Sequence, residues 1–408
     1  MPEELFLDRS IKKIESYFRW MGINIRSGDN NNKKDVFKIR CIYFINFVLL
    51  NTDVLGAIFW FRSGLEQGKT FTEVTYNAPC LTFSFLANFK MLSLIFYEKT
   101  VHELIAALQK LEIKHFLRQN CAEELKMLKD EKNFLHAVFK GSKIVNYASI
   151  LTFGCSPLVL IASNYYKTGR MDYLLPLIVL YPFDVDNITV WPIIYVRQIW
   201  SVITAVIGVC ATDYLFYTFC VYISTQFRLL GHSIERVVPN NGLSVRTRLN
   251  GNLRMKFVEN LKWHQELIRA ASLLEQIYTK STLYNFVTSS VIICLTGFNV
   301  AVVEDFAVIL SFLFFLFMSL LQIILLCFFG DKLMKSSTNI SDAVYNSKWY
   351  LTEKNVGKVL LMVQIRSQRA CRLTAYGFAE VNLRAFMKIL STAWSYFALL
   401  QSLYSSHE

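Results

Sequence analysis

Long apolar runs recur along this chain, and polar connections separate them. A transmembrane helix needs about 20 mostly apolar residues, and a soluble domain has no use for so many runs of that length. The candidate spans are Phe37 to Phe61, Ala78 to Tyr97, Ile144 to Tyr166, Ile194 to Ile223, Leu283 to Val303, Phe306 to Phe329 and Val381 to Tyr404. This pattern predicts an all-α membrane protein with seven transmembrane helices.

The last run differs from the others because its polar residues form a stripe. At 3.6 residues per turn, one face carries Arg384, Lys388, Ser391, Thr392, Ser395 and Ser402, with Leu399 interrupting it and Leu403 at its edge. Hydroxyl groups in hydrocarbon are costly unless they meet water or partner helices, so the stripe indicates a face along a wet path. The alternative is that these hydroxyls bond to carbonyls of their own helix or join helices together.

The placement of the basic residues predicts an orientation. The segments up to residue 40 and over 98–143, 224–280 and 330–384 carry nine Lys and Arg each, whereas the alternate linkers carry four in all. By the positive-inside rule, the amino terminus is then cytoplasmic and the carboxyl terminus extracellular. The net charge of +12 thus reports topology, and no nucleic-acid partner is expected. The sequon Asn187-Ile188-Thr189 falls on the outer side and is a candidate for glycosylation.

The same orientation argues against a receptor that signals through a G protein, because such receptors have the opposite topology. A secondary transporter is a weaker alternative than a G-protein receptor, since many transporters are built from two repeats and the spans here contain no duplicated half. Motifs for phosphate binding, metal-dependent hydrolysis or a nucleophilic serine are missing from the sequence. We therefore expect neither an enzyme nor a cofactor or metal site.

Charged segments between the spans have helical periodicity. Residues 98–140, 254–279 and 354–372 alternate apolar and charged positions in this way, which predicts a helical cytoplasmic anchor bundle. The expected divisions are a cytoplasmic segment 1–36, spans one to six with a ligand pocket over 37–329, an anchor region 330–380 and a pore-lining helix with an extracellular terminus over 381–408. Asp213 is either a functional intramembrane acid or the partner of a neighbouring helix. Lys90 is expected to extend toward the inner interface.

Short motifs, in a fixed order, carry a resemblance to a known family. They include Leu174-Leu175-Pro176, Tyr181-Pro182-Phe183-Asp184, Tyr195 to Gln198, Asp213-Tyr214-Leu215, His264 to Ile268, Gln322 to Gly330, Leu373-Thr374-Ala375 and Ser395-Tyr396-Phe397. Together they resemble the insect odorant receptors, seven-span subunits of ligand-gated cation channels. Tyr376-Gly377 departs from the Gly-Lys that members often carry. The chain also lacks the long cytoplasmic insertion of the family's coreceptor, so it resembles a ligand-binding tuning subunit.

The resemblance implies a tetramer with coreceptor subunits in the plasma membrane of a sensory neuron dendrite. The implied tetramer conducts cations, is embedded in membrane lipid and is gated by a small volatile organic molecule. The family holds its ligand among spans two, three, four and six, which here supply Phe85, Ser149, Phe153, Ser156, Tyr195, Ile199, Ile203, Phe306 and Leu310. The motif register in the last span implies a gate of Leu399 and Leu403, with Ser395, Gln401 and Ser402 along the pore.

Overall fold

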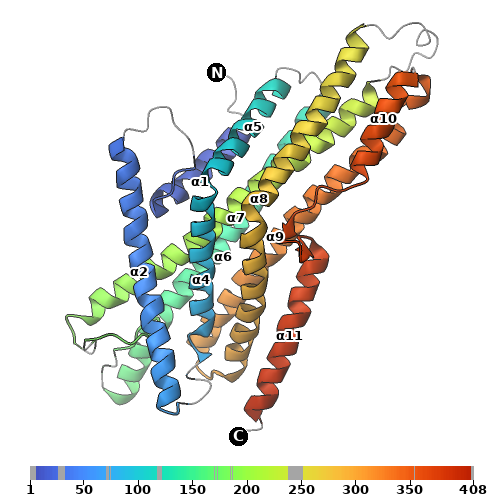
Figure 1. Ribbon diagram of the computed structural model, residues 1–408. Coiled ribbons are helices and arrows are strands. Elements are labelled where there is room, and N and C mark those ends of the chain that lie inside the picture. Colours follow the sequence, from blue (N-terminus) through green and yellow to red (C-terminus); the bar gives the residue numbers. More distant parts are fainter. Residues whose placement is uncertain are drawn as a thin grey trace.

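The chain folds into an elongated helical bundle with the two termini at opposite ends (Figure 1). The computed structural model describes residues 6–25, 33–69, 73, 75–116, 122–169, 171, 173–183, 185, 187–237, 251–352 and 354–405. Its elements are α1 (Phe6–Met21), α2 (Lys33–Glu66), α4 (Ala78–Phe96), α5 (Glu98–Phe116), α6 (Ala122–Thr168), α7 (Trp191–Arg236), α8 (Gly251–Val302), α9 (Phe306–Asn346), the 3-10 turn η1 (Trp349–Leu351), α10 (Lys354–Ser367), β1 (Thr374–Ala375), β2 (Ala379–Glu380) and α11 (Leu383–Ser405).

Six of these helices are long and apolar enough to cross a membrane. They are α2, α4, α6, α7, α8 and α9, and each contains one of the first six predicted runs, to within one residue at the end of the run. The all-helical membrane fold is thereby confirmed. The 23 residues of α11 are also long enough, but its polar stripe lowers its hydropathy, and the helix stays a predicted seventh span.

Helix α7 forms the centre of the bundle. Nearly every side chain from Ala211 to Leu230 is buried, because α7 packs against α1, α4, α6, α8 and α9. Several of its threonine hydroxyls are satisfied within the helix, as when the Thr218 hydroxyl donates to the carbonyl of Tyr214 at 2.8 Å. An apolar environment tolerates these residues because their polar atoms are already bonded.

Helix α1 was not predicted as a separate element, yet the structure buries one whole face of it. Leu7, Ile11, Ile14, Phe18 and Met21 recur every three or four residues and are almost completely buried against the bundle. The backbone N–H of Leu7 donates to the Glu112 carboxylate on α5 at 2.9 Å. The segment before the first span is therefore an integral part of the fold.

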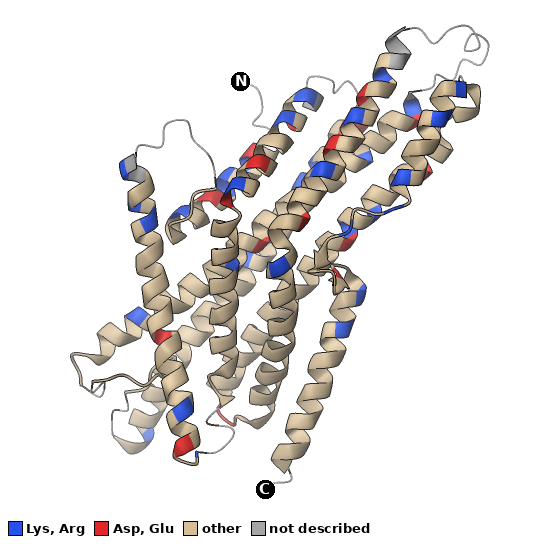
Figure 2. Ribbon diagram, in the orientation of Figure 1, with Lys and Arg blue, Asp and Glu red and all other residues tan. Residues whose placement is uncertain are grey.

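Charged side chains gather at one end of the molecule. Figure 2 shows Lys and Arg mostly along α1, α5, α10 and the upper part of α8, whereas the end of the bundle near the carboxyl terminus is poor in charge. The helical character predicted for the charged segments is confirmed for α5, the first half of α8 and α10. In Figure 1 these charged segments lie at one end of the same helical bundle as the membrane-capable helices.

A short hairpin leads the chain from α10 into α11. Strands β1 and β2 pair antiparallel around Tyr376-Gly377, and both turn residues have positive φ, at 52° and 79°. This backbone suits Gly377, because Gly adopts positive φ freely, whereas positive φ is uncommon for a residue such as Tyr376. Where α11 approaches α9, a side chain at Gly330 would come within 2.3 Å of the Val381 carbonyl. The absence of a side chain at Gly330 thus permits the close crossing.

Candidate functional site

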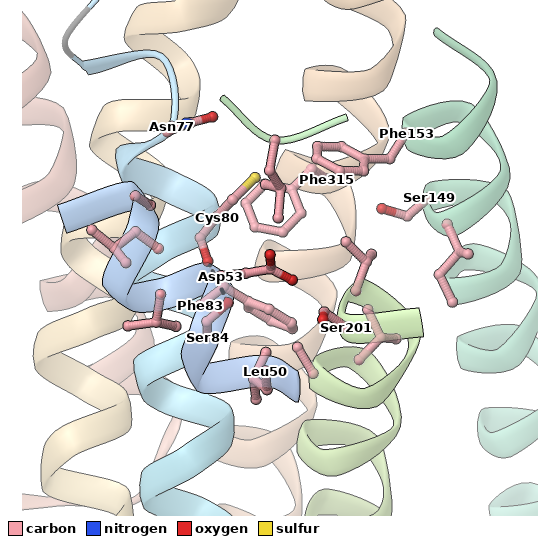
Figure 3. A pocket seen from close by; sticks show the side chains of 18 residues that line it. Leu50, Asp53, Asn77, Cys80, Phe83, Ser84, Ser149, Phe153, Ser201 and Phe315 are labelled. Carbon is pink, nitrogen blue, oxygen red and sulfur yellow. Dashed lines mark hydrogen bonds between the residues drawn. The ribbon is translucent and has the colours of Figure 1, made fainter. Parts of the chain in front are cut away.

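A cavity of about 50 Å³ lies between the membrane-capable helices near the end that carries the α6–α7 loop; we call it the central cavity. Figure 3 shows its lining. Most of the wall is apolar, and its apolar residues are Leu50, Val54 and Ala57 from α2, Cys80, Leu81 and Phe83 from α4, Ile150 and Phe153 from α6, Leu177, Val202, Ala205 and Val206 before and along α7, and Phe315 from α9. A wall of this kind suits a small apolar molecule.

One side of the central cavity is polar and is built around Asp53 on α2. The Asp53 carboxylate forms an ion pair with Arg197 of α7, and the Tyr181 hydroxyl donates to its Oδ1 at 3.0 Å. The Arg197 guanidinium also donates to the Tyr181 oxygen at 2.6 Å and to Thr52 Oγ1 at 2.9 Å. Burial raises the pKa of Tyr181 to about 12, so the phenol keeps the proton that it donates.

The α6–α7 loop forms a roof over the cavity, and two amide side chains hold it there. Gln198, which is fully buried, accepts from the N–H of Leu177 at 2.9 Å and donates to its carbonyl at 3.1 Å. Asn77 at the start of α4 bonds to the backbone of Ile178 in the same two-sided way. The bonds to Leu177 give a physical role to Gln198, the last residue of the Tyr195 to Gln198 motif.

Two further cavities adjoin the central one, each across a single phenylalanine. Phe153 lines both the central cavity and an outer cavity of about 120 Å³ beneath the roof. Phe83 lines both the central cavity and an inner cavity of about 30 Å³ that reaches Asp213. The Phe83 ring also packs edge-on against Phe315, with centroids 5.4 Å apart.

Asp213 is the centre of a buried polar cluster, and the expectation that Lys90 extends toward the interface is wrong. Lys90 and Asp213 are each 3% exposed, and Lys90 Nζ lies 2.6 Å from Asp213 Oδ1. Gln322 of α9 donates to the other oxygen at 2.9 Å. A lysine on the inner face of α4 can reach this carboxylate without leaving the bundle, and pairing keeps both charges from standing alone.

The predicted ligand residues occupy different environments. Ser149 and Phe153 line the central cavity, and Ser156 lines the outer one. Phe85 and Phe306 are instead 38% and 78% exposed, on the outside of the subunit.

The remaining predicted ligand residues lie behind these walls. Tyr195 is buried, and its hydroxyl donates to the carbonyl of Gly154. Ile199, Ile203 and Leu310 are half-buried and stand outside the linings of the three cavities.

Helix α11 turns its predicted polar stripe away from its own subunit. Ala385, Ile389 and Ala393 are buried against α8 and α9, and Tyr404 packs edge-on against Phe298. The residues of the stripe and the predicted gate are exposed: Arg384, Lys388, Ser391, Thr392, Ser395, Leu399, Ser402 and Leu403. Gln401 is also exposed, but at about 100° per residue it lies on the other side of α11 from Leu399.

The hydroxyl of Ser395 donates to the carbonyl of Ser391 at 2.9 Å. The alternative interpretation of the stripe, in which hydroxyls bond to their own helix, therefore applies to this residue. An exposed hydroxyl bonded in this way can still accept from water, so the bond does not exclude a wet path.

The candidate glycosylation site lies on an exposed turn. Asn187 and Thr189 are both exposed, and the Thr189 hydroxyl donates to Asn187 Oδ1 at 3.1 Å. Modification of Asn187 remains a prediction.

Sequence reasoning missed span one as a wall of the cavity, and with it Asp53. The signal was present, because Asp53 is an acid in the middle of the apolar run Phe37 to Phe61. Metal binding has no support here: the part of the chain that the structure describes holds no group of three His, Cys, Asp or Glu that could bind an ion.

Comparison with known proteins agrees with the motifs. The family model described as 7tm Odorant receptor matches residues 70–394. Odorant receptor 67c of Drosophila melanogaster is 24% identical over 395 residues, which cover 96% of this chain and 95% of that protein. Putative odorant receptor 92a of the same species is 23% identical and covers 98% and 97%.

A solved structure shares the fold. The insect olfactory receptor OR5 from Machilis hrabei, in complex with eugenol, superposes with a TM-score of 0.81 at 17% sequence identity, covering 97% of this chain and 98% of that one. Because the family model spans most of the sequence, this chain belongs to the odorant receptor family, whose members are multi-pass membrane receptors and not enzymes.

Proposed function

We propose that this chain is the odorant-binding subunit of a ligand-gated, non-selective cation channel and that its ligand occupies the central cavity. The observation that carries the proposal is a mostly apolar cavity whose roof is held down by Gln198 and Asn77. Burial of apolar surface contributes about 25 cal/mol per Å², so a small volatile molecule needs only one or two orienting hydrogen bonds. Eugenol, the ligand of the Machilis receptor, is a molecule of this size class.

In this proposal α11 lines the pore of a tetramer formed with coreceptor subunits. The support is that α11 exposes a polar face which its own subunit leaves uncovered. Leu399 and Leu403 would close the path by excluding water, with Ser395 and Ser402 on the same face of α11. A rotation of α11 would bring Gln401 or Ser402 toward the path in place of the leucines. A ligand opens such a gate only if it binds more tightly to the open state than to the closed one.

The proposed orientation has the charged end of the bundle in the cytoplasm. Its support is the concentration of Lys and Arg around α1, α5 and α10 (Figure 2). The channel would reside in the plasma membrane of a sensory neuron dendrite. Permeant cations must then pass Lys388, which we assign to a wide inner vestibule.

Current recording tests this function. Cells that express the chain with a coreceptor should give odorant-evoked cation current, and cells that express it alone should not. Leu399→Ala combined with Leu403→Ala should raise the current without ligand, because the ring that excludes water is gone. Trp394→Ala is the matched control, since this residue is 71% exposed but lies off the stripe. Gating that is unchanged in the double variant would remove α11 from the pore.

The G-protein alternative predicts a different location for the carboxyl terminus. An epitope fused after Glu408 should be labelled on intact cells if the channel proposal is right. Labelling that requires permeabilised cells would instead favour the alternative.

A further inference from the structure

One oxygen of Asp53 has no partner. Its Oδ1 accepts from Arg197 and Tyr181, whereas Oδ2 is buried and without a hydrogen-bond partner in the described part of the chain. The residue is only 3% exposed, so bulk water does not compensate this oxygen. A carboxylate oxygen left unbonded in apolar surroundings costs free energy, and a donor placed beside it recovers that cost.

The residue that carries this oxygen lines the central cavity. Among the residues that the structure describes, Asp53 is the only charged one in the lining of the central cavity. Figure 3 shows its carboxylate reaching from α2 into the ring of lining side chains. The hydroxyls of Ser84 and Ser201 already donate to backbone carbonyls, and Asn77 is bonded to the roof. The cavity thus offers a ligand one strong acceptor that nothing else in its wall satisfies.

The charge balance of the cavity decides which kind of donor fits. Arg197 already neutralises Asp53, and no second carboxylate lines the cavity. An ammonium group would therefore bring an uncompensated charge out of water, which is expensive in a poorly hydrated site. A neutral hydroxyl satisfies the oxygen without that cost.

We propose that the central cavity selects neutral hydroxyl-bearing volatiles, namely alcohols and phenols, and that the ligand hydroxyl donates to Asp53 Oδ2. This inference rests on the proposed function, because it concerns the ligand of the same site. Ser149 also lines the cavity, and its hydroxyl makes no hydrogen bond to the residues that the structure describes. A ligand oxygen that donates to Asp53 keeps lone pairs that can accept from Ser149.

Matched ligands test the selection on the unaltered channel. The probes are sets of volatiles on one carbon skeleton: an alcohol, its methyl ether and its primary amine, in straight-chain and benzylic series. The alcohol should act at roughly ten- to hundredfold lower concentration than the ether, as expected for a hydrogen bond to a charged group. Ethers that are as potent as alcohols, or amines that are more potent, would overturn the inference.

Asp53→Asn provides a second test that loss of folding cannot imitate. The amide can still accept from Arg197 and Tyr181 but offers an N–H donor in place of the free oxygen. The advantage of the alcohol should then be lost, because alcohol, ether and ketone oxygens can all accept from that N–H. Ser84→Ala is the matched control, because this hydroxyl lies in the same wall but is bonded to Cys80, and both ligands should shift alike.

The outcomes separate this inference from the function on which it rests. If no volatile evokes current, the channel proposal fails. If volatiles evoke current but the alcohol and ether do not differ, only the role of Asp53 fails. If Asp53→Asn responds to ethers and retains the alcohol preference of the unaltered channel, a residue other than Asp53 recognises the ligand hydroxyl, and the inference fails.

Discussion

Two of the buried carboxylates, Asp53 and Asp213, lie within the predicted spans, and each is paired with a basic side chain. Asp213 uses both of its oxygens, one for Lys90 and the other for Gln322. Asp53 uses one oxygen for Arg197 and Tyr181 and leaves the other unbonded beside a cavity. A saturated carboxylate holds helices together, whereas one with a free oxygen is equipped to bind something else.

The two carboxylates also differ in their surroundings. The Lys90 and Asp213 side chains are 3% and 5% exposed, whereas the Arg197 side chain that pairs with Asp53 is 20% exposed. Phe83 stands between the two regions, because it lines the cavity on either side. The Phe83 ring thus separates the central cavity, where we propose that the ligand binds, from the Lys90–Asp213 pair, to which we assign a structural role.

The largest expected effect comes from breaking the saturated pair. Asp213→Ala leaves Lys90 buried and unpaired, which should cost about 3–5 kcal/mol and lower the melting temperature of the purified channel in detergent. The double variant Lys90→Met with Asp213→Leu removes both charges and should melt well above the single variant. A double variant that is less stable than the single one would argue that the pair has a further role.

Loosening the roof should have a smaller effect. Gln198→Leu removes the partner of the Leu177 backbone and should cost about 1–3 kcal/mol where those groups stay buried. The concentration for half-maximal current should rise for alcohols and ethers in the same proportion, measured as paired dose-response curves. A changed alcohol preference in this variant would mean that Asp53 is not the only selector.

A smaller ring at the boundary between the two cavities should alter size selection. Phe83→Leu should cost about 1 kcal/mol in stability and join part of the inner cavity to the central one. Bulkier alcohols should gain potency relative to small ones in current recordings. Phe85→Leu is the control. Phe85 lies on the exposed side of α4, so this variant should leave the size preference unchanged.

Glu112, a buried carboxylate on α5 outside the predicted spans, shows how an unbonded oxygen is accommodated without a ligand. Burial raises the pKa of Glu112 to about 7, although the N–H of Leu7 lowers it, and its Oε2 has no partner within the described ranges. Because the folded state binds the proton more tightly than the unfolded one, docking of α1 should weaken as pH rises through about 7. The protection factors of the α1 amides, which correct hydrogen exchange for its intrinsic dependence on pH, should fall over this range.

Glu112→Gln should make those protection factors independent of pH in the same interval, since the Gln side chain does not titrate. Asp8 and Lys132 also act on this carboxyl, in opposite directions, so they remain unaltered in both proteins. Equal pH dependence in the two proteins would assign the effect to another group.

The sequence predicted the elements of the fold better than the contacts between them. Long apolar runs require membrane-capable helices because backbone groups must be satisfied in hydrocarbon, and six of the seven runs coincide with such helices. The hairpin around Tyr376 was missed, since two-residue strands leave no periodicity. The burial of α1 could have been predicted from its spacing of Leu7, Ile11 and Ile14.

The candidate site was harder to predict because it depends on which helix faces a neighbour. Ser149 and Phe153 reach the cavity. Phe85 does not line it and is 38% exposed, although the preceding residue of α4, Ser84, does line it. Depth in the membrane is readable from sequence, whereas rotation of a helix about its axis is set by tertiary packing. For the same reason, the pairing of Lys90 with Asp213 was visible only in three dimensions.

The most direct test compares the two carboxylates in one assay. Asp53→Asn and Asp213→Asn are each expressed with the coreceptor, and the alcohol-to-ether potency ratio is measured together with the amount of channel at the cell surface. We predict that Asp53→Asn abolishes the alcohol preference, whereas Asp213→Asn lowers the amount of channel and leaves the ratio unchanged. An Asp213→Asn channel that loses the preference, beside an Asp53→Asn channel that keeps the original ratio, would contradict the account.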